Sequence, residues 1–192
     1  MVNLNPQAPP PEAFVSFSAE VDVNTTEQLL AVMANFANLG VPKVHLLLSS
    51  PGGSVMPGIN AYNVLKGMPF TLVTHNVGNV DSIGNAIFLA GDERYACEHS
   101  TFMFHGVAYN GGNQIYDPKL AQERLDGLRA DQSRIGSIIV DRTSLATSVV
   151  EGFFRNAKTL TAQDALNGGI ISEIRPVVIP PGSPVASLVI NR

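Results

Sequence analysis

The chain has 192 residues, of which 45% are hydrophobic and 15% charged, with a formal net charge of −4 and a pI near 5.5. This length fits one domain with a sizeable core, and the acidic balance lacks the basic footprint of a nucleic-acid-binding protein. The single cysteine, Cys97, excludes an intramolecular disulfide. No apolar run approaches the roughly 20 residues of a membrane span, and the N-terminus lacks a signal-peptide pattern. We therefore expect a cytoplasmic globular protein without a membrane span.

The first half of the chain alternates predicted strands with predicted helices. Short apolar or alternating segments, typical of strands, lie at 14–19, 44–48, 70–74, 94–97 and 101–104. Apolar residues at helical spacing lie at about 25–39, 56–66 and 82–90. The first of these helices is expected to be capped by Asn24 or Thr25 and stopped by Gly40. This strand–helix order predicts an α/β fold with a parallel sheet.

The second half is expected to be mainly helical. Residues 106–117, GVAYNGGNQIYD, suggest a two-stranded excursion around a Gly-Gly turn. A long helix at 118–143 follows, then shorter helices at 148–155 and 162–167 and a strand at 170–174. We expect three regions: a flexible Pro-rich arm at 1–13, one domain at 14–175, and a Pro-rich tail at 176–192, whose SLVI segment could add a strand.

Three fragments carry candidate chemistry, namely SSPGGSV, HNVGNVDSIGNAIFLAG and STFMFHG. The glycines of the first let backbone N–H groups approach a ligand, although a plain tight turn explains them equally well. Ser82 lies at a strand-to-helix junction, where it is either a helix cap or a nucleophile. His105 closes an apolar strand and is either a structural residue or a base, a role for which His75 and His99 compete.

Taken in order, SSPGGSV, AYNVLK, GNVDSIGNAIFLAG, STFMFHG and TLTAQDALNGGIISEI resemble the ClpP family, the proteolytic subunits of Clp proteases, over about residues 14–174. The resemblance implies a crotonase-like fold, a repeated ββα superhelix with a parallel sheet and a protruding handle of one helix and a hairpin. It also implies a serine peptidase in which Ser82 is the nucleophile and His105 the base. The backbone N–H groups of Gly53 and Ile83 would form the oxyanion hole. Apart from the resemblance, the four histidines have no ligand-like spacing and Cys97 stands alone, so we expect no metal and no cofactor.

Two positions depart from the family pattern. The family has an aspartate shortly before the LTA motif, whereas this chain reads FFRNAKTLTA. Gapless alignment places Ala157 there and a one-residue insertion places Asn156 there. We favour Asn156 as the third catalytic residue, since an amide can orient an imidazole, and keep Glu151 and Asp141 as outside candidates.

The second departure is Asp81, which adjoins the nucleophile where the family has a small neutral residue. A carboxylate there opposes an oxyanion unless it points away or pairs with His75 or Arg94.

The resemblance further implies a peptide or unfolded-protein substrate and a homo-oligomer of hexameric or heptameric rings, which the handle could stack. An AAA+ unfoldase is a less expected partner, because only the Pro-rich arm precedes the first strand. Three alternatives stay open: a Ser/Lys dyad with Lys119 as the base, acyl-CoA chemistry on the same fold, and a catalytically impaired structural subunit.

Overall fold

The computed structural model describes residues 8–109, 111–112 and 115–188. Its strands are β1 (Ala13–Ser18), β2 (Lys43–Ser50), β3 (Thr71–Asp81), β4 (Glu93–Ala96), β5 (Thr101–Phe104), β6 (Lys158–Thr161), β7 (Glu173–Ile174) and β8 (Val185–Ser187). Its helices are α1 (Val23–Asn38), α2 (Val55–Lys66), α3 (Gly84–Leu89), α4 (Pro118–Arg142), α5 (Thr147–Arg155) and α6 (Ala162–Asn167). None of these helices is both long and apolar enough to cross a bilayer within the described part of the chain.

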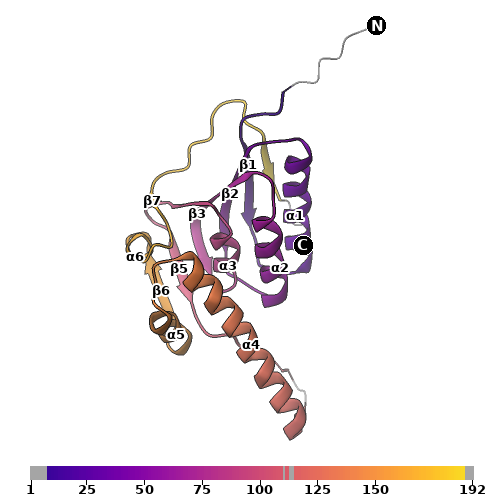
Figure 1. Ribbon diagram of the computed structural model, residues 1–192, viewed down its shortest axis with the longest axis vertical. Coiled ribbons are helices and arrows are strands. Elements are labelled where there is room, and N and C mark those ends of the chain that lie inside the picture. The colour runs from indigo at the N-terminus through magenta and orange to yellow at the C-terminus, as the bar shows by residue number, and fades with distance from the viewer. Residues whose placement is uncertain (1–7, 110, 113–114, 189–192) are drawn as a thin grey trace.

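The strands form one sheet in the order β6-β5-β3-β2-β1-β8, with β4 beside β3 and β7 beside β4. Every described pair is parallel except β5–β6, which is antiparallel. The predicted α/β class with a mainly parallel sheet is therefore confirmed. Figure 1 shows α1 and α2 side by side against the sheet. Their buried apolar side chains and those of the strands belong to one core.

The strand β3 forks the sheet and so determines where the site lies. Its first part, Val73 to Asn76, pairs with β4, and its last part, Asn79 to Asp81, pairs with β5. Because β2, β3 and β5 run parallel, their carboxyl ends meet at one edge of the sheet. The residues that follow these three strands, around Gly53, Ser82 and His105, are therefore brought to the same edge.

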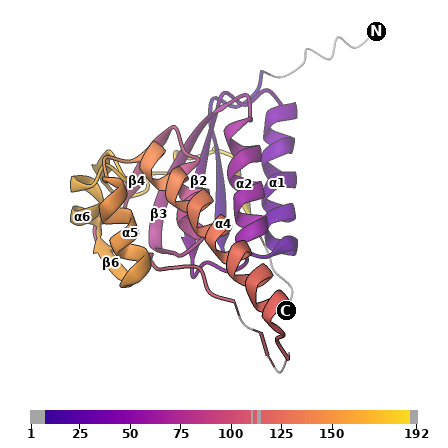
Figure 2. The same cartoon turned by 60° about the horizontal axis from the view of Figure 1, so that its bottom comes forward.

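The helix α4 leaves the body of the molecule as a long arm (Figures 1 and 2). Of its 25 residues only Ile135 and Ile139 are buried, and both lie in its C-terminal half. Leu125, nearer the free end, is 41% exposed. The predicted protruding handle helix is thus present. The predicted two-stranded excursion is described at residues 106–109, 111–112 and 115–117, and these residues include no strand. Residues 110, 113 and 114 lie outside the description.

Several predicted boundaries are wrong for identifiable reasons. Asp22, rather than Asn24 or Thr25, caps α1, because its carboxylate accepts the Thr25 N–H at 2.8 Å while the Thr25 hydroxyl accepts the Asp22 N–H at 3.0 Å. The third strand continues to Asp81, so the helix predicted from residue 82 starts at Gly84.

The structure describes the predicted arm and the predicted tail only in part. The tail contributes β8, which pairs with β1, although the SLVI segment lies partly outside the description. Residues 1–7 of the predicted arm and residues 189–192 of the tail also lie outside it.

Candidate active site

Ser82 occupies a strained turn between β3 and α3. Its φ of +54° is the only positive value at a non-glycine position among the described residues, and such a conformation costs about 1–3 kcal/mol. Neighbouring groups hold it there. The Ser82 N–H donates to the Met103 carbonyl at 2.8 Å, and Asn85 Nδ2 donates to the carbonyls of Met103 at 2.8 Å and Ser82 at 3.1 Å. The serine therefore lies on a turn rather than inside a helix.

The bend after β2 lies against this turn and requires glycine. Gly53 has φ +147°, and a Cβ there would lie 2.2 Å from the Val21 carbonyl oxygen. Two hydrogen bonds of 2.7 Å fix the bend, from the Val21 N–H to the Gly52 carbonyl and from the Ser54 N–H to the Val21 carbonyl. No side chain at position 53 is compatible with this geometry, which leaves the backbone accessible.

Two backbone donors at this edge are free. Within the described part of the chain, the N–H groups of Gly53 and Ile83 have no hydrogen-bond acceptor. Gly53, Ile83, Ser82 and His105 together line one pocket of about 100 Å³. Preorganised donors beside a serine hydroxyl are the arrangement that would suit a developing oxyanion, because they need no reorganisation during reaction.

His105 directly follows β5 and is half-buried. Its Nδ1 lies 2.7 Å from the Gly106 carbonyl oxygen. A carbonyl can only accept, so this contact places the proton on Nδ1 and leaves the Nε2 lone pair free. The described contacts include no hydrogen bond between His105 and the Ser82 hydroxyl. Such bonds often tighten only when substrate binds.

The rest of the pocket wall is apolar. It is formed by Val55, Phe104, Val107, Ala108, Ile135, Ile139 and Phe154 together with Gly106. Such a wall lowers the local dielectric and strengthens the electrostatic contacts of a bound substrate. It also offers a place for an apolar group of a ligand.

The predicted third residue is placed differently from the other four. Asn156 caps the C-terminus of α5, is exposed, and is absent from the pocket wall. The β5–β6 register sets Lys158 opposite Phe104, so the backbone near Asn156 passes beside His105. No described contact joins the Asn156 side chain to His105, and its role stays a prediction. Glu151 is also exposed, 3.8 Å from Arg155.

Asp81 points away from the pocket. Its Oδ2 accepts a hydrogen bond from Asn79 Nδ2 at 2.6 Å, and it does not line the pocket. Neither proposed partner pairs with it. His75 is buried against the Arg175 carbonyl at 3.0 Å, and Arg94 donates to backbone carbonyls.

Lys119 and His99 do not reach the site. The Lys119 side chain is 87% exposed at the start of α4 and lies 3.9 Å from Glu123. His99 is exposed in the turn between β4 and β5. Neither lines the serine pocket, whereas His105 does.

Sequence reasoning missed two asparagines. Asn79 contacts Asp81 and the end of β2, and Asn85 supports the serine turn. Asn85 is 1% exposed within the otherwise apolar helix α3. An amide inside an apolar helix was the available signal, because buried polar groups need hydrogen-bond partners.

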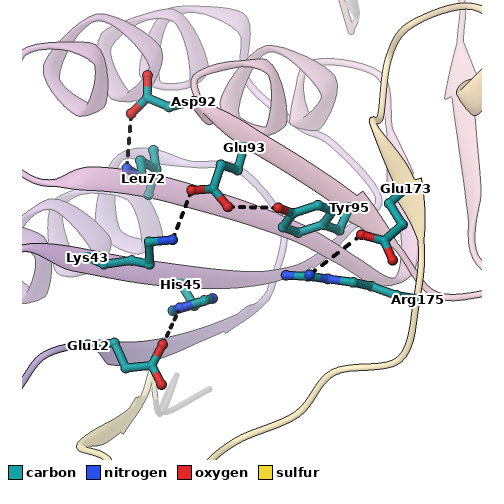
Figure 3. Close-up of polar contacts among 9 residues, drawn as sticks. All are labelled: Glu12, Lys43, His45, Leu72, Asp92, Glu93, Tyr95, Glu173 and Arg175. Atoms are coloured by element: carbon teal, nitrogen blue, oxygen red, sulfur yellow. Dashed lines mark hydrogen bonds and ion pairs between the residues drawn. The ribbon is translucent and has the colours of Figure 1, made fainter.

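A second polar cluster lies on the sheet away from this pocket (Figure 3). Glu12 pairs with His45 at 2.8 Å, Lys43 with Glu93 at 2.9 Å, and Glu173 with Arg175 at 3.6 Å. Burial lowers the pKa of His45 despite its carboxylate partner. Hydrogen bonds from Lys43 and Tyr95 lower the pKa of Glu93. These residues lie on β2, β4 and β7 or directly beside β1 and β7, and they do not line the serine pocket.

Comparison with known proteins agrees with this geometry. A family model described as Clp protease matches residues 11–177. A solved structure of a ClpP1 mutant from Listeria monocytogenes superposes with a TM-score of 0.75 and 20% identity, covering 84% of this chain and 90% of the other. That likeness confirms the predicted crotonase-like fold. The match over most of the chain shows that it belongs to the Clp protease family.

Proposed function

We propose that the protein is a serine peptidase that cleaves peptide bonds through an acyl-enzyme. His105 Nε2 takes the Ser82 hydroxyl proton as Oγ attacks the peptide carbonyl carbon. The carbonyl oxygen becomes an oxyanion facing the N–H groups of Gly53 and Ile83. Removing one such donor typically costs about 3–4 kcal/mol of transition-state stabilisation.

The second half of the cycle returns the enzyme to its starting state. His105 gives its proton to the leaving amine as the C–N bond breaks, which leaves an ester on Ser82. Water then attacks the ester while His105 takes its proton, and the collapse of the second tetrahedral intermediate releases the acid and restores the Ser82 hydroxyl.

One observation carries this proposal: Ser82, His105 and two backbone N–H groups without acceptors in the described structure line a single pocket. The Gly106 carbonyl supports the Nδ1 proton of His105 but, being neutral, stabilises the imidazolium less than an aspartate. Asn156 remains the proposed third residue, although its side chain is exposed and does not line the pocket.

We further propose that the substrate is an extended peptide or an unfolded protein segment, bound along the edge near Gly53 and Val55 by main-chain hydrogen bonds. The family and the exposed arm of α4 support a homo-oligomer of hexameric or heptameric rings. An AAA+ unfoldase is the less supported partner. We also propose a cytoplasmic location, with which the single cysteine agrees.

The test is covalent labelling of the folded protein with a fluorophosphonate, mapped by mass spectrometry. We expect the label on Ser82, complete loss in Ser82→Ala, a loss of about 10³-fold or more in rate for His105→Ala, and little change in Lys119→Ala. A fast-labelling His105→Ala with a slow Lys119→Ala would favour the Ser/Lys dyad. A folded wild-type protein that resists both fluorophosphonate and β-lactone probes would favour the structural subunit.

The same panel tests the third residue. Asn156→Ala should lower the labelling rate by about tenfold or more if Asn156 orients His105 in the assembled enzyme. A loss below about threefold would assign the orienting role to the Gly106 carbonyl instead.

A further inference from the structure

The strand that leads to Ser82 contains an unusual irregularity. Leu48 of β2 pairs with Asn76 of β3, but Ser50 pairs with Val80. Residues 77–79 therefore lie opposite Ser49 alone, and the backbone ladder between the two strands is interrupted. This interruption falls directly before both halves of the site, the serine turn on β3 and the glycine bend on β2. The ladder resumes there with the single pair Ser50–Val80, so a side-chain contact across the interruption adds directly to the register of the two halves.

The Asn79 side chain spans the interruption. Its Nδ2 donates to Asp81 Oδ2 at 2.6 Å and to the Ser50 carbonyl at 3.3 Å. Its Oδ1 accepts from the Ser49 hydroxyl at 3.2 Å. The orientation of the amide follows from these partners, because a reversed amide would set its oxygen against a carboxylate and a carbonyl.

The two acceptors belong to the two halves of the site. Asp81 is the residue before Ser82, and Ser50 is followed by Pro51 and the two bend glycines. The Ser50 hydroxyl also accepts the Gly52 N–H at 3.1 Å. One NH₂ group therefore ties the nucleophile turn to the oxyanion bend, using one hydrogen for each.

We propose that Asn79 is a positioning residue that holds the Ser82 turn and the Gly53 bend at the separation that acyl transfer needs. It does so by donating one hydrogen to the Asp81 carboxylate and the other to the Ser50 carbonyl. The same bond keeps the carboxylate of Asp81 turned from the pocket, which explains how an anion is tolerated next to the nucleophile. The inference rests on the proposed peptidase function, because it assigns a role within that site.

Three variants separate this role from general packing. Asn79→Asp keeps the shape of the side chain but replaces the donor NH₂ by an oxygen. Ser49→Ala is the matched control, because it removes the bond to Oδ1 and leaves both Nδ2 bonds in place. The double variant Asn79→Asp with Asp81→Asn exchanges the two residues. This exchanged pair restores a donor–acceptor contact between positions 79 and 81 but leaves the Ser50 carbonyl without its donor.

The rate constant of Ser82 labelling by a fluorophosphonate, with kcat and KM for a short fluorogenic peptide, gives the readout. We expect Asn79→Asp to lower the labelling rate and kcat by about tenfold or more, with KM within about twofold. Ser49→Ala should stay within about twofold of wild type, and the exchanged pair should stay at least about fivefold low. Asn79→Ala, measured beside Asn79→Asp, gives the same loss without added charge.

The proposal is overturned if Asn79→Asp and Asn79→Ala both react within about twofold of wild type. It is equally overturned if Ser49→Ala loses as much rate as they do, or if the exchanged pair recovers fully. Amide hydrogen exchange tests the tie without any activity measurement: the hydrogen-bonded amides of Gly52 and Ser54 should exchange faster in Asn79→Ala, and those of helix α1 should not. A wild-type protein that does not react with the probe would end the peptidase proposal. The amide hydrogen exchange of the Asn79 variant would still decide whether Asn79 ties the two segments together.

Discussion

Replacing Gly52 by alanine tests how closely the glycine bend and the serine turn are packed. Gly52 has φ +87°, and a Cβ there would lie 2.7 Å from Ser82 Cβ and 2.8 Å from the Asp81 carbonyl oxygen. Both atoms belong to the rigid turn, so relief requires the turn or the bend to move. The substitution therefore adds steric overlap to an unfavourable backbone conformation.

Gly182 provides the matched control. Its φ is +85°, and a Cβ there would meet no atom within 4 Å. The left-handed backbone costs an L-residue about 1–2 kcal/mol, partly offset by a gain of about 0.4–1 kcal/mol from the less flexible unfolded chain. This cost should apply to both Gly182→Ala and Gly52→Ala, because their φ values of +85° and +87° are nearly the same.

The difference between the two variants then isolates the overlap. Overpacking typically costs about 1–3 kcal/mol, so urea unfolding should show Gly52→Ala to be less stable than Gly182→Ala by about that amount. Fluorophosphonate labelling of Ser82 should fall by about tenfold or more only in Gly52→Ala. Equal unfolding free energies, together with unchanged labelling, would refute the close approach of the bend to Ser82.

Three further predictions follow from other parts of the structure. Ser82→Gly should be more stable than Ser82→Ala by about 1 kcal/mol in urea unfolding, because glycine relieves the strain of φ +54°; equal stabilities would argue against that strain. Burial lowers the pKa of His75 below its ordinary value of 6.5, so the unfolded chain takes up the proton first as the pH falls. The free energy of unfolding should therefore be fully present above pH 6.5 and decline below it. His75→Gln should make the decline of the unfolding free energy with falling pH less steep, and the part due to His45 should remain. An unchanged decline would contradict the role given to His75. Leu125 is a large apolar side chain exposed on the arm, so Leu125→Asp should lower the assembly mass in light scattering. The matched Ala130→Asp should not lower it. Ile138 is a less suitable position because it packs against the core. An unchanged mass would count against assembly through α4.

Much of the fold could be predicted from the sequence, because its signals are local. Helical spacing and glycine stops located α1, α2 and α6, and apolar runs located β2 and β5. Ser82, His105, Gly53 and Ile83 could be proposed together because a shared order of motifs, rather than any single residue, carried the resemblance. The structure brings these four residues to one pocket.

The remaining features depend on contacts that are distant in sequence. The interruption opposite Ser49 exists only when β2 and β3 pair, so the task of Asn79 leaves no local pattern. The strand β6 is short and mostly exposed and is stabilised by pairing with β5. The Gly106 carbonyl beside His105 Nδ1 is a backbone group, so no side-chain motif in the sequence indicates it.

The most direct test of the central claim is a crystal structure of the protein after reaction with a fluorophosphonate. Our account predicts a bond from phosphorus to Ser82 Oγ, with the phosphonyl oxygen about 2.7–3.1 Å from the backbone nitrogens of both Gly53 and Ile83 and with His105 Nε2 next to Oγ. An adduct on another residue, or a phosphonyl oxygen turned away from both nitrogens, would contradict it.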